Sequence, residues 1–201
     1  MGKALKRVGI CALVALAVWL GGVVADREAL SGKLIRLHVV AASDSEADQA
    51  VKLQVRDAVL RSIREDLEAA CDVEAAKTYL RENQPKLQQV ANEALRAAGM
   101  EPSAVVSLCK ERFDTRIYDT FTLPAGIYDA LRIVIGSGQG HNWWCVVFPS
   151  LCLPATTDGF QAEAVGAGFS RELTDTLTGE YEVRFFLLDW LGRVQNRLHG
   201  D

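Results

Sequence analysis

The hydrophobic pattern starts with a long uncharged stretch, Val8 to Ala25, which is preceded by three basic residues and followed by Asp26. Its 18 residues are just enough to cross a hydrocarbon core as a helix. The small and aliphatic residues at its end also fit a signal-peptidase site. We therefore expect residues 1–25 to be a signal peptide or a membrane anchor, and residues 26–201 to form one exported domain outside the cytoplasm.

After this leader the pattern predicts a strand followed by helices. Leu34 to Val40 is rich in branched apolar residues and leads into Ala41–Ser45, a cluster typical of turns and helix caps. From Glu46 to Leu67 apolar residues recur at helical spacing, with charged residues between them. Two more helices are expected between Asp72 and Gly99, separated near Pro85 because proline has no amide donor.

The second half of the chain has mainly strand-like patterns. The predicted strands are Ala104–Cys109, Tyr128–Ile135, His141–Phe148 and Tyr181–Phe185. Asp158–Gly168 has few large side chains and predicts a mobile loop, and Leu188–Leu198 predicts a short terminal helix. The expected fold class is α+β, with an apolar leader, helices mainly in the first half and a largely antiparallel sheet in the second.

Charge and composition narrow the possible functions. Without the leader, the chain has 19 Lys and Arg and 26 Asp and Glu, so its net charge is −7. This negative charge argues against nucleic-acid binding. The remaining 176 residues are enough for one domain with a substantial core. Three histidines in the whole chain provide little material for a metal cluster, so we expect no metal and no cofactor.

The most distinctive segment is Gly136–Cys152, which contains three glycines, two adjacent tryptophans and two cysteines. In a strand, Trp143 and Trp144 would point to opposite faces of the sheet. Cys145 and Cys152 can pair if the chain folds back at the proline between them. Four exported cysteines allow three pairings, of which we favour this one.

Two functional interpretations of the same segment, a phosphate-binding loop and a thiol nucleophile, have little support. Its G-x-G-x-G motif is followed by a strand-like sequence, whereas a phosphate-binding loop needs a helix behind it, so we expect a glycine-rich hairpin turn. A thiol nucleophile at Cys145 could use His141 or His38 as its base, but no third group is identifiable to orient the imidazole. We therefore predict no catalytic residues.

Six residues are the candidates for binding a partner protein. They are His38, Asp44, Arg56, Asp57, Trp143 and Trp144. The simplest alternatives are structural: His38 as a half-buried residue bonded to a carboxylate such as Asp44, and Asp44 as a helix cap. Arg56 and Asp57 would then form a solvated face or an ion pair, and the tryptophans would belong to the core. An exposed tryptophan would instead be a strong partner anchor.

Four segments together resemble the stage II sporulation protein R family of endospore-forming bacteria. They are Leu34–Ser45, Asp48–Val59, Leu123–Tyr128 and Gly136–Cys152. The resemblance spans residues 30 to 198, and its most specific part is Asn142–Pro149 with Leu151 and Cys152.

This resemblance implies a signalling protein that is made in the forespore and exported into the space between forespore and mother cell. There it would activate a membrane-embedded aspartic protease, which removes the pro-sequence of sigma factor E. The expected partner is the extracytoplasmic part of that protease, and an uncleaved leader would add contact with the membrane. The resemblance provides no catalytic residues for the signalling protein itself.

Two other classes of function stay open from the sequence. One is an exported hydrolase that acts on a wall or peptide substrate through Cys145 or an acidic group. The other is a disulfide-bonded adhesion or scaffold module that binds without changing the activity of a protease.

Overall fold

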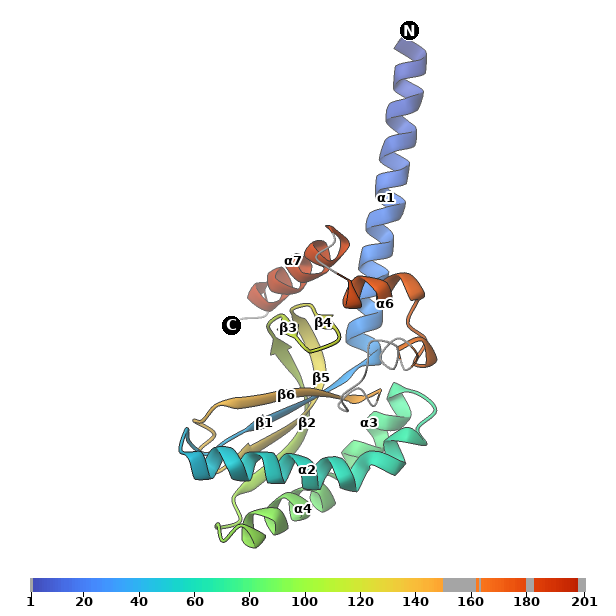
Figure 1. Ribbon diagram of the computed structural model, residues 1–201. Coiled ribbons are helices and arrows are strands. Elements are labelled where there is room, and N and C mark those ends of the chain that lie inside the picture. The colour runs from blue at the N-terminus through green and yellow to red at the C-terminus, as the bar shows by residue number, and fades with distance from the viewer. Residues whose placement is uncertain (1, 150–161, 163, 180–182, 199–201) are drawn as a thin grey trace.

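The structure is a computed structural model that describes residues 2–149, 162, 164–179 and 183–198. Its centre is a four-stranded sheet with the order β2 (Ala104–Phe113), β5 (Gly126–Ile135), β1 (Ile35–Val40) and β6 (Asn142–Phe148). Helices cover both faces of this sheet, and one long helix projects from the domain (Figure 1). The α+β fold class predicted from the sequence is confirmed.

The sheet is mostly antiparallel, with one parallel pair. β5 pairs antiparallel with β2, and β6 pairs antiparallel with β1. The central strands β1 and β5 are parallel, with Leu37 opposite Leu131. The sequence patterns located these strands, but the pairing of β1 with β5 joins segments about 90 residues apart, which local patterns do not encode.

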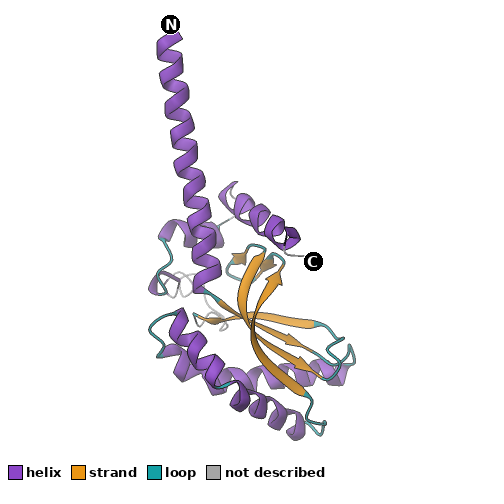
Figure 2. Ribbon diagram, turned by 180° about the vertical axis from the view of Figure 1, so that it is seen from behind, coloured by secondary structure: helices purple, strands orange, loops and turns teal. Residues whose placement is uncertain are grey.

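Three helices, α2 (Glu46–Glu68), α3 (Val73–Glu82) and α4 (Gln84–Ala97), pack against one face of the sheet (Figure 2). The predicted cap is confirmed at Ser45, whose hydroxyl accepts from the amide of Asp48 at 3.2 Å. The predicted break near Pro85 is also confirmed, because this proline lies in the first turn of α4. The first core cluster fills this layer and includes Leu37, Val39, Val55, Val59, Ile63, Leu80, Leu87, Leu131 and Ile133.

The other face is covered by the end of α1 (Gly2–Lys33), by α6 (Arg171–Thr178) and by α7 (Val183–Leu198). A small ribbon of β3 (Arg116–Ile117) and β4 (Thr122–Leu123) lies beside them. The second core cluster fills this layer and includes Val23, Leu30, Phe113, Tyr128, Ala130, Val146, Phe169, Leu173, Phe185 and Leu188. The domain therefore has one core on each side of its sheet.

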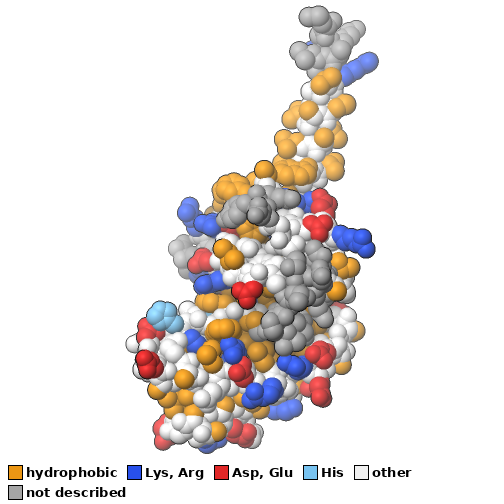
Figure 3. Space-filling view, viewed as in Figure 1, with side chains coloured by type: hydrophobic (Ala, Val, Ile, Leu, Met, Phe, Trp, Pro, Cys, Tyr) orange, Lys and Arg blue, Asp and Glu red, His pale blue; other side chains and the backbone are white. Residues whose placement is uncertain are grey.

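Helix α1 is continuous across the expected boundary at residue 25. Its segment Lys6–Lys33 is long and apolar enough to cross a membrane, and only 6% of its most apolar 18-residue window is buried in the protein. From Val23 onwards the helix packs on the domain, with Val23 and Leu30 buried in the second core cluster. The free part of α1 projects as a stem with hydrophobic side chains along it (Figure 3).

The strand predicted at Tyr181–Phe185 is wrong where the structure describes it, because Val183 already belongs to α7. The buried residues of this segment recur at helical spacing, at Phe185, Leu188 and Gly192. They lie on the side of the helix that packs against β5, and this packing outweighs the short alternating pattern that predicted a strand. The loop predicted at Asp158–Gly168 lies partly outside the described residues. Its described part is helical at residues 162 and 164–166.

Candidate partner-binding site around strand β6

Strand β6 lies at an edge of the sheet, with β1 as its neighbouring strand on one side and no strand beyond it in the described part of the chain. Its first residues are exposed and its later residues are buried. Trp143 and Trp144 point to opposite faces, as the strand pattern predicted: Trp143 contacts α2, and Trp144 lies in the layer of the second core cluster. The two indoles therefore belong to two different environments.

On the α2 face, Trp143 contacts an arginine. The guanidinium carbon of Arg56 lies 4.3 Å from the ring centroid, which is the geometry of a cation–π contact. Arg56 also forms an ion pair with Asp57 at 2.7 Å, so three of the predicted site residues come together here. Trp143 keeps 37% of its surface exposed, and tryptophan is a residue type enriched among the residues that dominate binding energy at interfaces.

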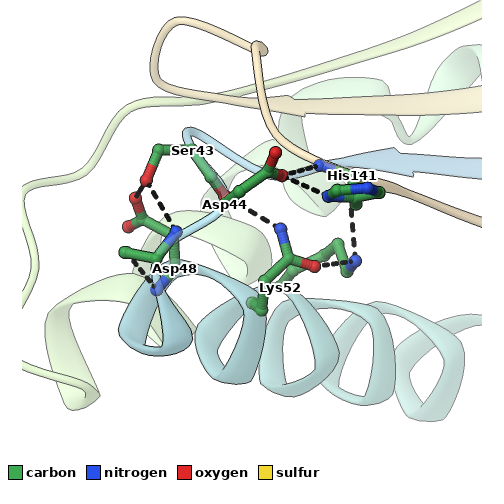
Figure 4. A network of polar contacts seen from close by, with 7 residues as sticks. Ser43, Asp44, Asp48, Lys52 and His141 are labelled. Carbon is green, nitrogen blue, oxygen red and sulfur yellow. Dashed lines mark hydrogen bonds and ion pairs between the residues drawn. The ribbon is translucent and has the colours of Figure 1, made fainter.

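Next to this group, a polar network ties the start of α2 to the start of β6 (Figure 4). The carboxylate of Asp44 accepts from the backbone amide of His141 at 2.6 Å and also contacts its imidazole. Lys52 donates from Nζ to the carbonyl of His141 at 3.0 Å and to the side chain of Gln49 at 2.6 Å. Asp44, which we also expected as a cap, therefore holds His141, while Ser45 caps the helix.

Hydrogen bonding and burial shift two pKa values in this network. The backbone hydrogen bond from His141, together with its side chain, lowers the pKa of Asp44 below the ordinary 3.8. Burial lowers the pKa of Lys52 from its ordinary 10.5, because the charged form is partly removed from water. The exposed Asp44 carboxylate is therefore held ionised by its donors.

The glycine-rich segment before β6 is not the hairpin turn that the sequence predicted. β5 and β6 are not neighbours, because β1 lies between them, and the segment crosses over the end of β1. The amide of Gly140 donates to the carbonyl of Ala41 at 3.0 Å, and a Cβ on Gly140 would lie 2.2 Å from the carbonyl oxygen of Ser43. The glycine is needed for this close approach of two backbone segments.

On the opposite face, Trp144 stacks on His38 with ring centroids 3.7 Å apart. The Nδ1 atom of His38 lies 2.9 Å from both carboxylate oxygens of Glu111 on β2. Arg116 also lies over the same indole, with its guanidinium carbon 4.8 Å from the ring centroid. His38 is bonded to a carboxylate as expected, but the partner is Glu111 and not Asp44.

Arg36 is a buried residue that the sequence reasoning missed. It is 0% exposed, lies over Phe113 at 3.9 Å and Tyr128 at 5.0 Å, and donates to the hydroxyl of Tyr118 at 2.9 Å. Among the described residues no carboxylate lies within ion-pair distance of it. The sequence feature that could have indicated its burial is the position of Arg36 between apolar residues in a predicted strand.

The structure places the cysteines of the described residues and shows whether potential metal ligands come together there. Cys145 packs in the first core cluster, on the face of β6 opposite to His38, so the two do not form the nucleophile and base of a thiol site. Cys152 lies outside the described residues, and its pairing with Cys145 stays a prediction. Cys71 and Cys109 are free thiols. In the part of the chain that the structure describes, no three potential ligands come together around a metal position.

Of the six predicted site residues, four are brought together on the α2 side of β6 or next to it, namely Asp44, Arg56, Asp57 and Trp143. His38 and Trp144 form a separate group on the other side of the sheet. Partner binding by any of them stays a prediction. The geometry offers a surface with an exposed tryptophan, an arginine and a strand edge.

Comparison with known proteins identifies the family. A family model described as stage II sporulation protein R matches residues 31–158. The stage II sporulation protein R of Bacillus subtilis (strain 168) is 32% identical over 180 residues, which cover 78% of this chain and 79% of that protein. No solved structure matches the chain. The chain therefore belongs to the stage II sporulation protein R family, and its role is in sporulation.

Proposed function

We propose that this protein is an exported signal that activates a membrane-embedded aspartic protease, which then processes the precursor of sigma factor E. The observation that carries the proposal is the match of residues 31–158 to the stage II sporulation protein R family. The organisation of the chain supports it, because a long apolar helix precedes a folded domain that has an exposed aromatic surface.

The proposed location is the space between the forespore and the mother cell. The basic residues Lys6 and Arg7 precede the apolar part of α1 and stay on the cytoplasmic side under the positive-inside rule. The domain from Leu34 onwards then lies outside the forespore cytoplasm, where it can meet a protease in the mother-cell membrane.

The proposed contact surface is the start of β6 with the adjoining part of α2. In the described part of the chain β6 is an edge strand of the sheet, and an extended segment of a partner can add to such an edge by backbone pairing. Trp143 and Arg56 belong to the residue types that dominate binding energy at protein interfaces. An activator must bind the active form of its target more tightly than the inactive form, since equal affinity shifts no population.

The test is to co-produce the full chain with the protease and its sigma-factor precursor in a bacterium that does not sporulate. Processed sigma factor, measured by immunoblot, should appear when the full chain is present. Complete absence of processing, with the chain exported and folded, would overturn direct activation.

The contact surface has its own test in the same system. Trp143→Ala should reduce processing at limiting amounts of the chain, because loss of an interface anchor costs about 2 kcal/mol, or about 30-fold in affinity. Ile117→Ala is the matched control, since Ile117 is 80% exposed and lies on β3, which is on the side of the sheet that Trp144 faces and Trp143 does not. Equal processing by both variants would place the contact elsewhere.

A further inference from the structure

Helix α7 has large apolar side chains on its outer surface. Val183, Phe186 and Trp190 are 70%, 57% and 51% exposed, respectively. Their spacing of three and four residues places them on one stripe of the helix. The opposite side of α7 is buried against the sheet through Phe185 and Leu188. Such a stripe on a folded domain indicates a contact surface, because soluble domains rarely expose clustered large apolar residues.

The same stripe continues into basic residues. Arg193 and Arg197 follow Trp190 at the same helical spacing, and both are exposed. The guanidinium of Arg193 donates to Asp189 at 2.8 Å, yet 60% of its side chain stays in solvent. The outer side of α7 is therefore apolar in its first half and positively charged in its second half.

The first turn of α7 is held against α1 near residues 22–26 of α1. Arg184 donates from Nε to the carboxylate of Asp26 at 2.8 Å, and it also pairs with Glu172. A Cβ built on Gly22 would lie 3.8 Å from the Arg184 guanidinium. Arg27 donates to Gln195 near the other end of α7. Both ends of α7 are thus tied to the segment 22–27.

This level coincides with the expected edge of the hydrocarbon core. At about 1.5 Å per residue, the 18 residues from Val8 to Ala25 rise about 27 Å, close to the ~30 Å thickness of a bilayer core. With Lys6 and Arg7 at the cytoplasmic edge, Asp26 lies at the outer edge. Figure 1 shows α7 on the side of the domain from which the stem projects, and Figure 3 shows hydrophobic side chains on the stem and on the adjacent part of the domain.

We propose that α1 is retained as a membrane anchor and that the outer stripe of α7 docks on the surface of the same membrane. Val183, Phe186 and Trp190 enter the interfacial layer, where tryptophan is favoured because its ring is apolar and its N–H is polar. Arg193 and Arg197 lie at the level of the lipid phosphates and contact them. The domain is then held in one orientation by two contacts, the anchor and α7.

Retention of α1 follows from its packing. Val23 is 1% exposed in the second core cluster, and the helix passes without interruption through residues 23–25. Proteolysis favours irregular segments, whereas residues 23–25 are helical and Asp26, which follows them, pairs with Arg184 of α7. Cleavage after Ala25 would also remove a buried side chain from the core.

The test uses the full chain in vesicles of phosphatidylcholine and phosphatidylglycerol, with part of the lipid brominated near the headgroup to quench tryptophan fluorescence. All variants carry Trp19→Phe, because Trp19 lies within the anchor. Adding Trp190→Phe should remove most of the quenching, whereas adding Trp143→Phe, the matched control on β6, should leave it unchanged. This design leaves the partly buried Trp144 in place.

Two outcomes would overturn the proposal. One is that Trp190→Phe and Trp143→Phe change the quenching equally, which would mean that α7 does not touch the bilayer. A stripe that binds only a partner protein would give this result, because the vesicles contain lipid and no partner. The other is a mature N-terminus near Asp26, found by mass spectrometry of the protein extracted from its native membrane. Neither outcome depends on whether the chain activates a protease.

Discussion

The imidazole of His38 on β1 reaches the carboxylate of Glu111 on β2 across the strand that separates them. Nδ1 lies 2.9 Å from both oxygens, and β5 occupies the position between β1 and β2. The contact is part of a stack in which Trp144 covers the ring of His38. The polar contact joins β1 to β2, and the stack adds β6, so the two contacts together connect three strands on the side of the second core cluster.

Replacing Glu111 by leucine should destabilise the domain by about 1–3 kcal/mol, because it leaves the buried Nδ1 of His38 without a partner. Glu111→Gln is the matched control, since its amide oxygen still accepts a hydrogen bond, and it should have a smaller effect. Urea unfolding followed by tryptophan fluorescence measures both. A leucine variant as stable as the glutamine variant would show that the contact contributes little.

Gly192 on α7 should not tolerate a side chain. A Cβ at this position would lie 1.6 Å from the carbonyl oxygen of Ala125, so Gly192→Ala must displace α7 from the start of β5. We expect a loss of about 1–3 kcal/mol or more from this overpacking. Thermal unfolding by circular dichroism measures it.

The matched control for that substitution is Gly32→Ala, at a helical glycine with no atom within 4 Å of the added Cβ. Alanine has the higher helix propensity, so this variant should be neutral or more stable by up to about 1 kcal/mol. If Gly192→Ala behaved in the same way as Gly32→Ala, the close packing of α7 on Ala125 would be disproved.

Asp44 should titrate below 3.8 in the folded chain, because the hydrogen bonds from His141 favour its ionised form. A carboxyl group with a lowered folded pKa contributes stability that is present above the unfolded pKa and is lost as the pH falls through the folded pKa. The tie between the start of α2 and the start of β6 should therefore weaken only at strongly acidic pH.

Carbon-13 NMR of the Asp44 carboxyl group measures this titration. His141→Ala removes the imidazole donor and keeps the backbone donor, so it should raise the pKa of Asp44 only part of the way toward 3.8. A carboxyl group that titrates at or above 3.8 in the unmodified chain would contradict the described network.

The predicted pairing of Cys145 with Cys152 should appear in the exported protein as a loop that opens on reduction. Cys152→Ser should then lower the free energy of unfolding by about 2–3 kcal/mol under oxidising conditions, and reductant should remove the difference. Cys71→Ser is the control, since Cys71 is a free and exposed thiol. Peptide mapping by mass spectrometry, with and without reduction, identifies the bond, and another pairing would refute the prediction.

Local sequence patterns were sufficient for most helices and strands. The helical spacing from Glu46 to Leu67, the cap at Ser45 and the proline after Asn83 each act within a few residues, so they predicted α2 and the start of α4. The apolar stretch from Val8 likewise predicted a membrane-spanning or export helix. These features depend on the chemistry of neighbouring residues and need no information about distant ones.

The sequence by itself therefore determined the α+β class, the apolar helix and the placing of Trp143 and Trp144 on opposite faces of a strand, because each follows from a local period. Only the tertiary structure decided which strands pair, and with them the partners of the buried polar residues. β1 lies between β5 and β6, so the glycine-rich segment crosses over its end instead of forming a hairpin. Glu111 is 73 residues from His38, and no local pattern encodes a contact at that distance.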